Sequence, residues 1–125
     1  MAKILIVDDE QDIRDLVNLT LSFGGDQVIT AANGEEAYQK VISETPDLIL
    51  LDVRMPRESG YETCKRLQAN KATKNIPIVF LSAKGQESEV KAGLEAGAVD
   101  YIIKPFSLEE LAHRIHKILL DSKKS

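Results

Sequence analysis

Short apolar runs recur along the chain and predict five β-strands. They cover residues 3–7, 27–31, 47–51, 76–81 and 99–103. The segments ILIV and LILL, in the first and third runs, are apolar at every position, as strands are when both faces of their sheet are covered. This pattern is typical of parallel sheets and favours an α/β domain.

Segments with helical spacing lie between and after these runs. The clearest is the last, whose apolar residues form one stripe: Leu108, Leu111, Ala112, Ile115, Ile118 and Leu119. Three helix starts show a capping residue followed three positions later by Glu: Ser59, Ser107 and, in a looser form, Asn33. Gly24 and Gly97 stand where helices should end. Strand and helix therefore alternate, which predicts a doubly wound α/β domain with a parallel sheet.

The composition fits one domain that spans residues 1–125. Apolar residues make up 43% and charged residues 29%, which excludes a disordered or fibrous chain. Sixteen basic and twenty acidic side chains give a net charge of −4, which argues against direct binding to nucleic acid. A single cysteine, with no signal peptide and no membrane-spanning run, indicates a cytoplasmic protein. The polar segment 121–125 fits either a natural terminus or the start of a linker.

Reactive side chains follow four of the five predicted strands, where ligands of open parallel α/β sheets bind. These residues are Asp8, Asp9, Asp52, Ser82 and Lys104. Neighbouring strands would bring the three aspartates together, and each pair of carboxylates would repel by about 4 kcal/mol at an effective dielectric constant near 20. Such a cluster needs a cation. We interpret the nearby Glu10 and Asp12 as solvated carboxylates or helix caps.

Charge and ligand type indicate which cation the cluster would hold. Three carboxylates and the Lys104 ammonium leave two negative charges, the complement of one divalent ion. Oxygen ligands with room for water favour Mg²⁺ over Ca²⁺. The side chains that zinc would prefer stand elsewhere in the sequence. We interpret Cys64 as a core residue, and His113 and His116 as exposed residues of the last helix.

Asp52 is the candidate acceptor of a phosphoryl group. It stands alone at the end of a buried apolar strand, whereas Asp8 and Asp9 are adjacent and better placed to share a metal ion. An aspartate beside Mg²⁺ and a lysine can accept a phosphoryl group, because Lys104 and the metal would neutralise charge on the transferring oxygens. The Ser82 hydroxyl would donate a hydrogen bond to one of these oxygens.

Four motifs occur in order at the predicted strand ends. They are ILIVDDE (residues 4–10), LLDVRMPRESG (50–60), FLSA (80–83) and AGAVDYIIKPF (96–106). Together they resemble the receiver domain of bacterial two-component response regulators, over essentially the whole chain. In extent the chain is similar to the stand-alone chemotaxis and sporulation regulators of that family. The resemblance implies a flavodoxin-like fold, with five helices and a five-stranded parallel sheet in the order 2-1-3-4-5.

The resemblance also implies roles for individual residues. Asp52 would be phosphorylated by a phosphohistidine of a partner, either a sensor histidine kinase or a histidine phosphotransfer protein. Mg²⁺ would be held by Asp9, Asp52 and the main-chain carbonyl of Arg54. Asp8 would bind the same ion through water.

Ser82 and Tyr101 match the switch pair of this family. In that pair the hydroxyl moves toward the phosphoryl group and the aromatic ring turns inward behind it. Phosphorylation would change the face formed by the fourth helix, fifth strand and fifth helix, which a downstream protein target or effector domain would read. The sequence leaves open whether a phosphorylation-dependent homodimer forms instead. The Lys104–Pro105 bond is expected to be cis.

Some positions depart from the commonest family pattern. Ser82 often appears as threonine, and Arg57 and Glu58 make the loop after the acceptor more polar than usual. Arg54 and Lys84 are basic where many relatives have neutral or acidic residues. These two either slow hydrolysis of the phosphorylated aspartate or are solvated side chains whose ion pairs contribute about 0–1 kcal/mol.

Two other functional classes fit the sequence less well. A flavin-binding electron carrier needs a phosphate-binding Ser/Thr/Gly loop and aromatic rings, but the loop here is DDEQD and aromatic residues make up 5%. A phosphatase with an aspartyl nucleophile usually has a second acid two residues later, and Arg54 occupies that position. The sequence therefore favours a signalling switch that assists its own phosphorylation and dephosphorylation, rather than an enzyme acting on separate substrates.

Overall fold

Strands and helices alternate along the computed structural model, which describes residues 2–55, 57–83 and 87–124. The strands of this part of the chain are β1 (Lys3–Val7), β2 (Gln27–Ala31), β3 (Leu48–Asp52), β4 (Ile78–Ser82) and β5 (Asp100–Ile103). Its helices are α1 (Gln11–Phe23), α2 (Gly34–Glu44), α3 (Gly60–Ala69), α4 (Glu87–Glu95) and α5 (Leu108–Lys124). The predicted α/β class is confirmed.

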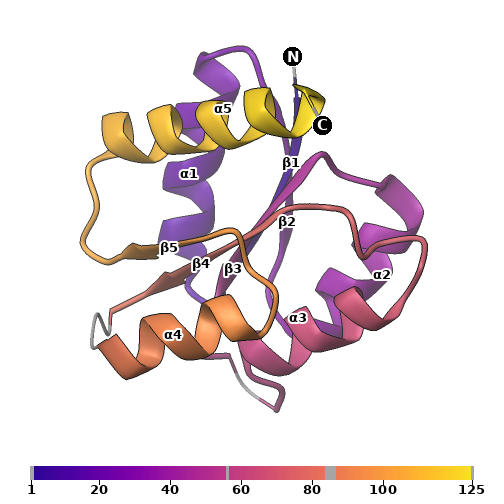
Figure 1. Cartoon of the computed structure of the whole chain (residues 1–125). Helices are drawn as coiled ribbons and strands as arrows, with labels where there is room; N and C mark the ends of the chain where they lie inside the picture. The colour runs from indigo at the N-terminus through magenta and orange to yellow at the C-terminus, as the bar shows by residue number, and fades with distance from the viewer. Residues whose placement is uncertain (1, 56, 84–86, 125) are drawn as a thin grey trace.

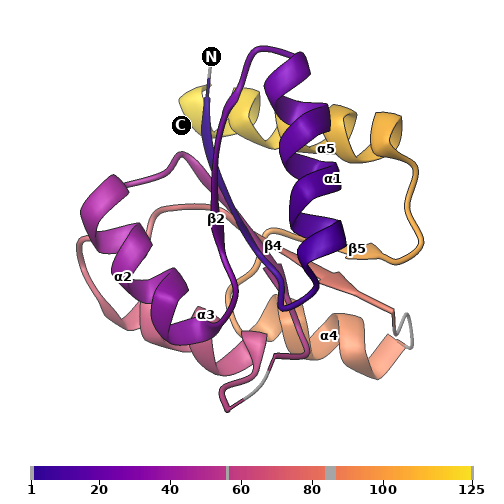
Figure 2. The same cartoon turned by 180° about the vertical axis from the view of Figure 1, so that it is seen from behind.

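The strands form one parallel sheet in the predicted order β2-β1-β3-β4-β5. Helices α1 and α5 cover one face of the sheet, and α2, α3 and α4 cover the other (Figures 1 and 2). The strand order reverses between β1 and β3, so a crevice is expected beyond their carboxyl ends.

Both faces of the sheet are buried, which explains the continuous apolar runs in the sequence. Leu5 and Ile49 pack toward α2 and α3, while Ile4 and Leu50 pack toward α1 and α5. Successive side chains of a strand point to opposite faces, so each central strand contributes to both cores. Strands β3 and β4 are buried at every position. They therefore support the residues at their carboxyl ends on a well-packed base.

Two strand ends lie one residue beyond their predicted positions. β3 includes Asp52 and β4 includes Ser82, because main-chain pairing of parallel strands does not require an apolar side chain. Asp52 pairs with Leu81 in the ladder, so strand backbone holds the candidate acceptor. β3, β4 and β5 also begin later than predicted, and β4 begins only after Pro77, which has no N–H to donate.

Three of the described helices, α2, α3 and α5, begin at the predicted caps. Ser59 and Glu62 form a reciprocal capping box at the start of α3. The side chains of Asn33 and Ser107 each accept a hydrogen bond from the main-chain N–H three residues later. Helix α1 ends just before Gly24, as expected. Among the described residues, no helix combines the length and the apolar character needed to cross a membrane.

Candidate functional site

A cleft of about 410 Å³ lies at the carboxyl ends of β1, β3, β4 and β5. Its lining residues are Asp9, Glu10, Asp52, Arg54, Ser82, Ala83 and Lys104. Most of the residues singled out from the sequence therefore come together here. Asp8 is buried beside the cleft and contacts Lys104, whereas Tyr101 lies on the side of the sheet that α4 covers.

Asp8 is the buried member of the acidic cluster. Its carboxylate accepts hydrogen bonds from the main-chain N–H of Glu10 (2.9 Å) and from Nζ of Lys104 (2.8 Å). Arg14 donates from Nη1 to the main-chain carbonyl of Asp8 (2.6 Å). The contacts with Glu10 and Lys104 supply the partners that a buried carboxylate requires.

Asp9 and Glu10 are exposed next to Asp8. Each of the three residues has a carboxylate oxygen within 4.8 Å of the others. Oε1 of Glu10 also lies 3.9 Å from Nζ of Lys104. Glu10 is exposed and is the N-cap residue of α1, as interpreted, although its side chain makes no capping hydrogen bond. The residue also belongs to the acidic cluster, which that interpretation left out. Its position directly after Asp9 was the available signal.

Asp52 lies at the end of β3, and only 5% of its surface is exposed. Its Oδ1 is 3.5 Å from Nζ of Lys104. Burial raises the pKa of Asp52 to about 6, with the negative charges of Asp8 and Asp9 adding to the shift and Lys104 opposing it. A further cation beside Asp52 would favour its charged form. The electrostatics of the cleft are thus suited to a bound cation.

Lys104 follows β5 and reaches back to the acidic residues. It contacts Asp8, Asp52 and Glu10, and most of its side chain is buried. Burial by itself would lower the pKa of Lys104, but the hydrogen bond to Asp8 and the surrounding negative charges outweigh burial and raise the pKa. The ammonium therefore stays charged at neutral pH. The bond between Lys104 and Pro105 is cis, as predicted.

The loop after Asp52 folds back onto the end of β3. The N–H of Gly60 donates to the carbonyl of Val53 (2.8 Å), and a Cβ at position 60 would collide with the main-chain oxygen of Asp52. The first turn of α3 therefore requires glycine at this position. Arg54 is exposed and lines the cleft, while the role of its carbonyl as a metal ligand stays a prediction.

One network near this loop was missed in the sequence analysis. Nη1 of Arg66 lies 2.9 Å from Glu58 and 3.4 Å from Glu35, and its guanidinium lies 4.4 Å from the centre of the Tyr38 ring. Glu58 thus connects the loop to α2 and α3 as well as making it polar. Arg66 lies about 30 positions from Glu35 and Tyr38 in the sequence, and the four residues match no local motif, so no pattern pointed to the contact.

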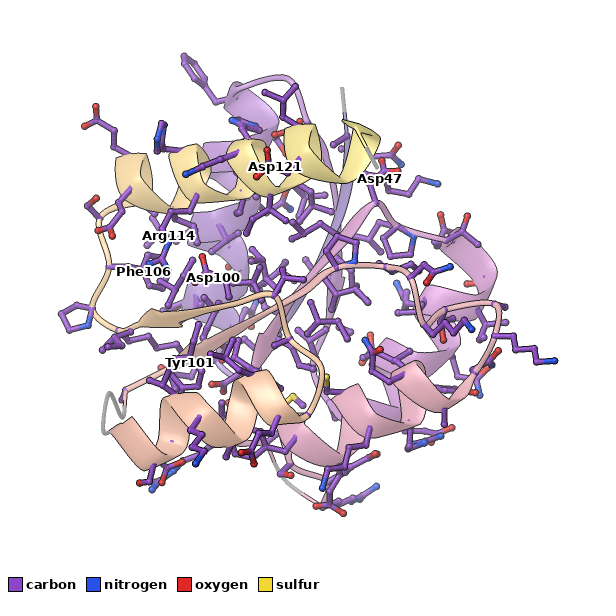
Figure 3. The ribbon with its side chains drawn as sticks, in the orientation of Figure 1. Asp47, Asp100, Tyr101, Phe106, Arg114 and Asp121 are labelled. Atoms are coloured by element: carbon purple, nitrogen blue, oxygen red, sulfur yellow. The ribbon has the colours of Figure 1, made fainter. Side chains whose placement is uncertain are left out.

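Ser82 and Tyr101 occupy adjacent strands. Ser82 is buried at the end of β4 and lines the cleft. Tyr101 is buried in β5, where it pairs with Phe80, and its ring centre is 6.2 Å from that of Phe80. Figure 3 shows Tyr101 between β5 and α4. The ring of Tyr101 is thus already buried in the unmodified chain, and the role of the two residues as a switch pair stays a prediction.

The remaining candidates lie away from the cleft or outside the described residues. Cys64 is fully buried in the core, as predicted, and burial raises its pKa to about 11. His113 is exposed, as expected. His116 is half exposed, but its Nε2 lies 2.7 Å from Oδ2 of the buried Asp26. Lys84 lies outside the described residues, so its effect on a phosphorylated state stays a prediction.

The family profile of the response regulator receiver domain matches residues 4–116. The chain belongs to this family. A receiver domain is a phospho-acceptor module of two-component signalling rather than a conventional enzyme, and it binds Mg²⁺. Receiver domains of this family act in phosphorylation-controlled signalling.

This receiver domain is similar to parts of larger regulators. It is 45% identical over 116 residues to the phosphate regulon transcriptional regulatory protein PhoB of Pseudomonas aeruginosa, covering 93% of this chain and 51% of that protein. It is 48% identical over 117 residues to the alkaline phosphatase synthesis transcriptional regulatory protein PhoP of Bacillus subtilis, covering 94% and 48%. The chain thus spans about half the length of these curated relatives.

Solved receiver structures share the same fold. The chemotaxis response regulator CheY4 of Vibrio cholerae superposes with a TM-score of 0.90 at 36% identity, covering 94% of this chain and 98% of that one. A two-component response regulator from Clostridium difficile gives a TM-score of 0.91 at 31% identity, with complete coverage (100%) of both chains. The predicted receiver fold is therefore confirmed by both sequence and structure.

Proposed function

We propose that Asp52 of this receiver domain accepts a phosphoryl group from a phosphohistidine of a sensor histidine kinase or a histidine phosphotransfer protein. The observation that carries the proposal is the position of Asp52 in the cleft, at the end of β3 and within reach of Lys104. A carboxylate oxygen of Asp52 forms a bond to phosphorus while the phosphorus–nitrogen bond of the donor breaks. The electron pair of the broken bond returns to the donor's imidazole.

The donor set of the cleft fits Mg²⁺. All candidate ligands are oxygens, and the carboxylates of Asp8, Asp9 and Asp52 exceed the single charge of Lys104 by two. Asp9, Asp52 and the main-chain carbonyl of Arg54 would hold the ion, and Asp8 would bind it through water. When bound, Mg²⁺ supplies positive charge beside the phosphoryl oxygens.

The chain's own residues then stabilise the transferring group. The Lys104 ammonium, held by Asp8, offsets negative charge that Asp52 gains on phosphorylation. The hydroxyl of Ser82 donates a hydrogen bond to one phosphoryl oxygen. Tyr101, on the neighbouring strand, changes position with Ser82 and carries the change to the surface.

The output surface in this proposal is the face formed by α4, β5 and α5. Leu94 of α4, Ile103 of β5 and Val99, which directly precedes β5, are exposed. Arg114 of α5 makes a bidentate ion pair with Asp100 of β5 (Figure 3). A downstream protein target, an effector domain or a second phosphorylated copy would bind this face. We place this receiver domain, over residues 1–125, in the cytoplasm, and the domain itself makes no direct contact with nucleic acid in this proposal.

Phosphorylation from a small donor tests the assignment of Asp52. We expect acetyl phosphate with Mg²⁺ to add one phosphoryl group to the wild type, measured by intact mass, and none to Asp52→Asn. The variant Asp121→Asn, at an exposed position of α5, is the matched control and should be labelled like the wild type. Equal labelling of Asp52→Asn would refute the assignment.

A further inference from the structure

Three aromatic rings from three elements meet on the α4 side of the sheet. Tyr61 comes from α3, Phe80 from β4 and Tyr101 from β5. The ring centres of Tyr61 and Phe80 are 5.1 Å apart in an edge-to-face arrangement, and those of Phe80 and Tyr101 are 6.2 Å apart. Phe80 is fully buried. Tyr61, Phe80 and Tyr101 thus form an aromatic cluster.

Gly93 of α4 completes the space that the Tyr101 ring occupies. A Cβ at position 93 would lie 2.9 Å from Cδ2 of Tyr101 and 3.0 Å from Cδ2 of Phe80. Real Cβ contacts are longer than this, so the ring fits against the helix only because position 93 has no side chain. The buried position of Tyr101 therefore depends on how α4 is placed.

The hydroxyl of Tyr61 connects this cluster to the first turn of α4. It lies 3.1 Å from the main-chain carbonyl oxygen of Glu89 and 3.1 Å from Oε2 of the same residue. Burial raises the pKa of Tyr61 above its ordinary value, and hydrogen bonding to Tyr101 and to Glu89 adds to the shift. The phenol therefore stays protonated and can donate. Tyr61 thus contacts α4 through its hydroxyl, and its ring packs on Phe80, which in turn packs on the ring of the candidate switch tyrosine.

Tyr61 directly follows Gly60, whose backbone lies against the end of β3, the strand that carries Asp52. The backbone of Gly60 packs against the main-chain oxygen of Asp52 and donates to Val53. Gly60 and Tyr61 both belong to the first turn of α3. A displacement of the loop between Asp52 and Gly60 would therefore move Tyr61 as well. This gives a second physical connection between Asp52 and α4, separate from the strand that carries Ser82.

We propose that Tyr61 is a positioning residue that holds Tyr101 in its buried orientation and fixes the first turn of α4 to α3. The proposal rests on the proposed function, because it extends the Ser82 and Tyr101 switch to a third residue. Tyr61 contacts no reacting atom. It acts through its hydroxyl, which holds Glu89 of α4, and through its ring, which packs on Phe80 beside Tyr101.

The test compares two variants that each lose one tyrosine hydroxyl. Tyr61→Phe removes the contact to Glu89. Tyr38→Phe is the matched control, since its hydroxyl accepts a hydrogen bond from Asn70 (2.9 Å) on the far side of α3. Tyrosine ring signals are followed by NMR with ¹³C-labelled tyrosine, and amide hydrogen exchange is measured in α4. The chain has only three tyrosines, so single substitutions assign every ring.

We expect Tyr61→Phe to shift the Tyr101 ring signals and to speed exchange of the α4 amides about fivefold, as loss of one hydrogen bond predicts. The Tyr38→Phe variant should leave both measurements unchanged. The proposal would be overturned if Tyr61→Phe matched the wild type in both its Tyr101 ring signals and its α4 amide exchange.

A loss of global stability would speed amide exchange throughout the sheet. Faster exchange confined to α4 therefore distinguishes a local role of Tyr61 from a global one. Addition of a beryllofluoride phosphoryl mimic provides the link to switching. We expect the response of α4 to the mimic to be smaller in Tyr61→Phe than in Tyr38→Phe, and an equal response would exclude a role in switching. If the wild type takes no phosphoryl group on Asp52, the proposed function fails. The measurements on the unmodified chain still decide the role of Tyr61.

Discussion

Single atoms set the geometry around the acceptor at the residue scale. The hydrogen that replaces a side chain at Gly60 allows the first turn of α3 to lie against the carbonyl of Asp52. The reciprocal contacts of Ser59 and Glu62 fix that turn from the other side. Addition of one methyl group at Gly60 should therefore affect both the stability of the fold and the geometry of the acceptor site.

We expect Gly60→Ala to lower the free energy of unfolding by about 1–3 kcal/mol, as overpacking of a close contact usually does. It should also reduce phosphorylation of Asp52, because the main-chain oxygen of Asp52 must move. Urea unfolding and intact-mass labelling measure the two effects. Gly24→Ala is the control, since its Cβ would meet nothing closer than 3.5 Å and its φ of −78° suits alanine. Equal stability of the two variants would contradict this account of Gly60.

The buried thiol of Cys64 gives a pH-dependent prediction. Burial raises its pKa from 9.0 to about 11, so the folded state binds more protons than the unfolded state between these values. Stability conferred by the protonated thiol is therefore present below pH 9 and is lost as the pH rises toward 11. Relative to Cys64→Ser, the wild type should lose up to about 2–3 kcal/mol across this window.

Urea unfolding of both proteins from pH 8 to 11 measures the difference for Cys64. The comparison with Cys64→Ser cancels the titration of lysines and tyrosines that the two chains share. If the difference in free energy of unfolding between the two proteins stayed constant with pH, the raised pKa of Cys64 would be contradicted. Labelling with a thiol reagent at pH 8 gives an independent measurement, and it should be much slower in the folded wild type than in urea.

At the scale of elements, the sequence predicted those features that depend on residues close together in the chain, such as helix starts. Capping residues such as Ser59 and Ser107 act within four residues of a helix start, so they could be identified without a structure. Strand ends were less certain because pairing continues through polar residues such as Asp52. The contact of Tyr61 with Glu89 depends on how α3 and α4 pack, which no local pattern determines.

Helix α4 provides a prediction at this scale. Gly93→Ala should displace the Tyr101 ring, because the new Cβ would lie 2.9 Å from Cδ2 of that ring. The helix itself should not weaken, since alanine favours helix by about 1 kcal/mol over glycine. Quenching of tyrosine fluorescence by acrylamide measures the exposure, as the chain has no tryptophan. Ala92→Ser, at an exposed position of the same helix, is the control. Quenching of Gly93→Ala at the wild-type level would show that the ring does not depend on position 93.

At the scale of the whole molecule, the sheet topology explains why the site could be predicted. Parallel strands end at one edge of the sheet, so Asp8, Asp52 and Lys104 were expected to meet although they are far apart in the sequence. No comparable rule predicted the pair formed by Asp26 and His116, which joins the turn after α1 to α5. Such a contact is determined by the angle between two helices, which the sequence pattern does not specify.

The placement of the two chain ends has a practical consequence. β1 starts and α5 ends at the same pole of the molecule (Figures 1 and 2). The cleft lies at the opposite end of the sheet, beyond the carboxyl ends of the strands. Asp26 lies at this pole, where it contacts both the main-chain N–H of Ala2 and His116. A tag or surface anchor attached at either end would leave the cleft facing solution. Binding of a kinase to immobilised protein should therefore be the same for both attachment points.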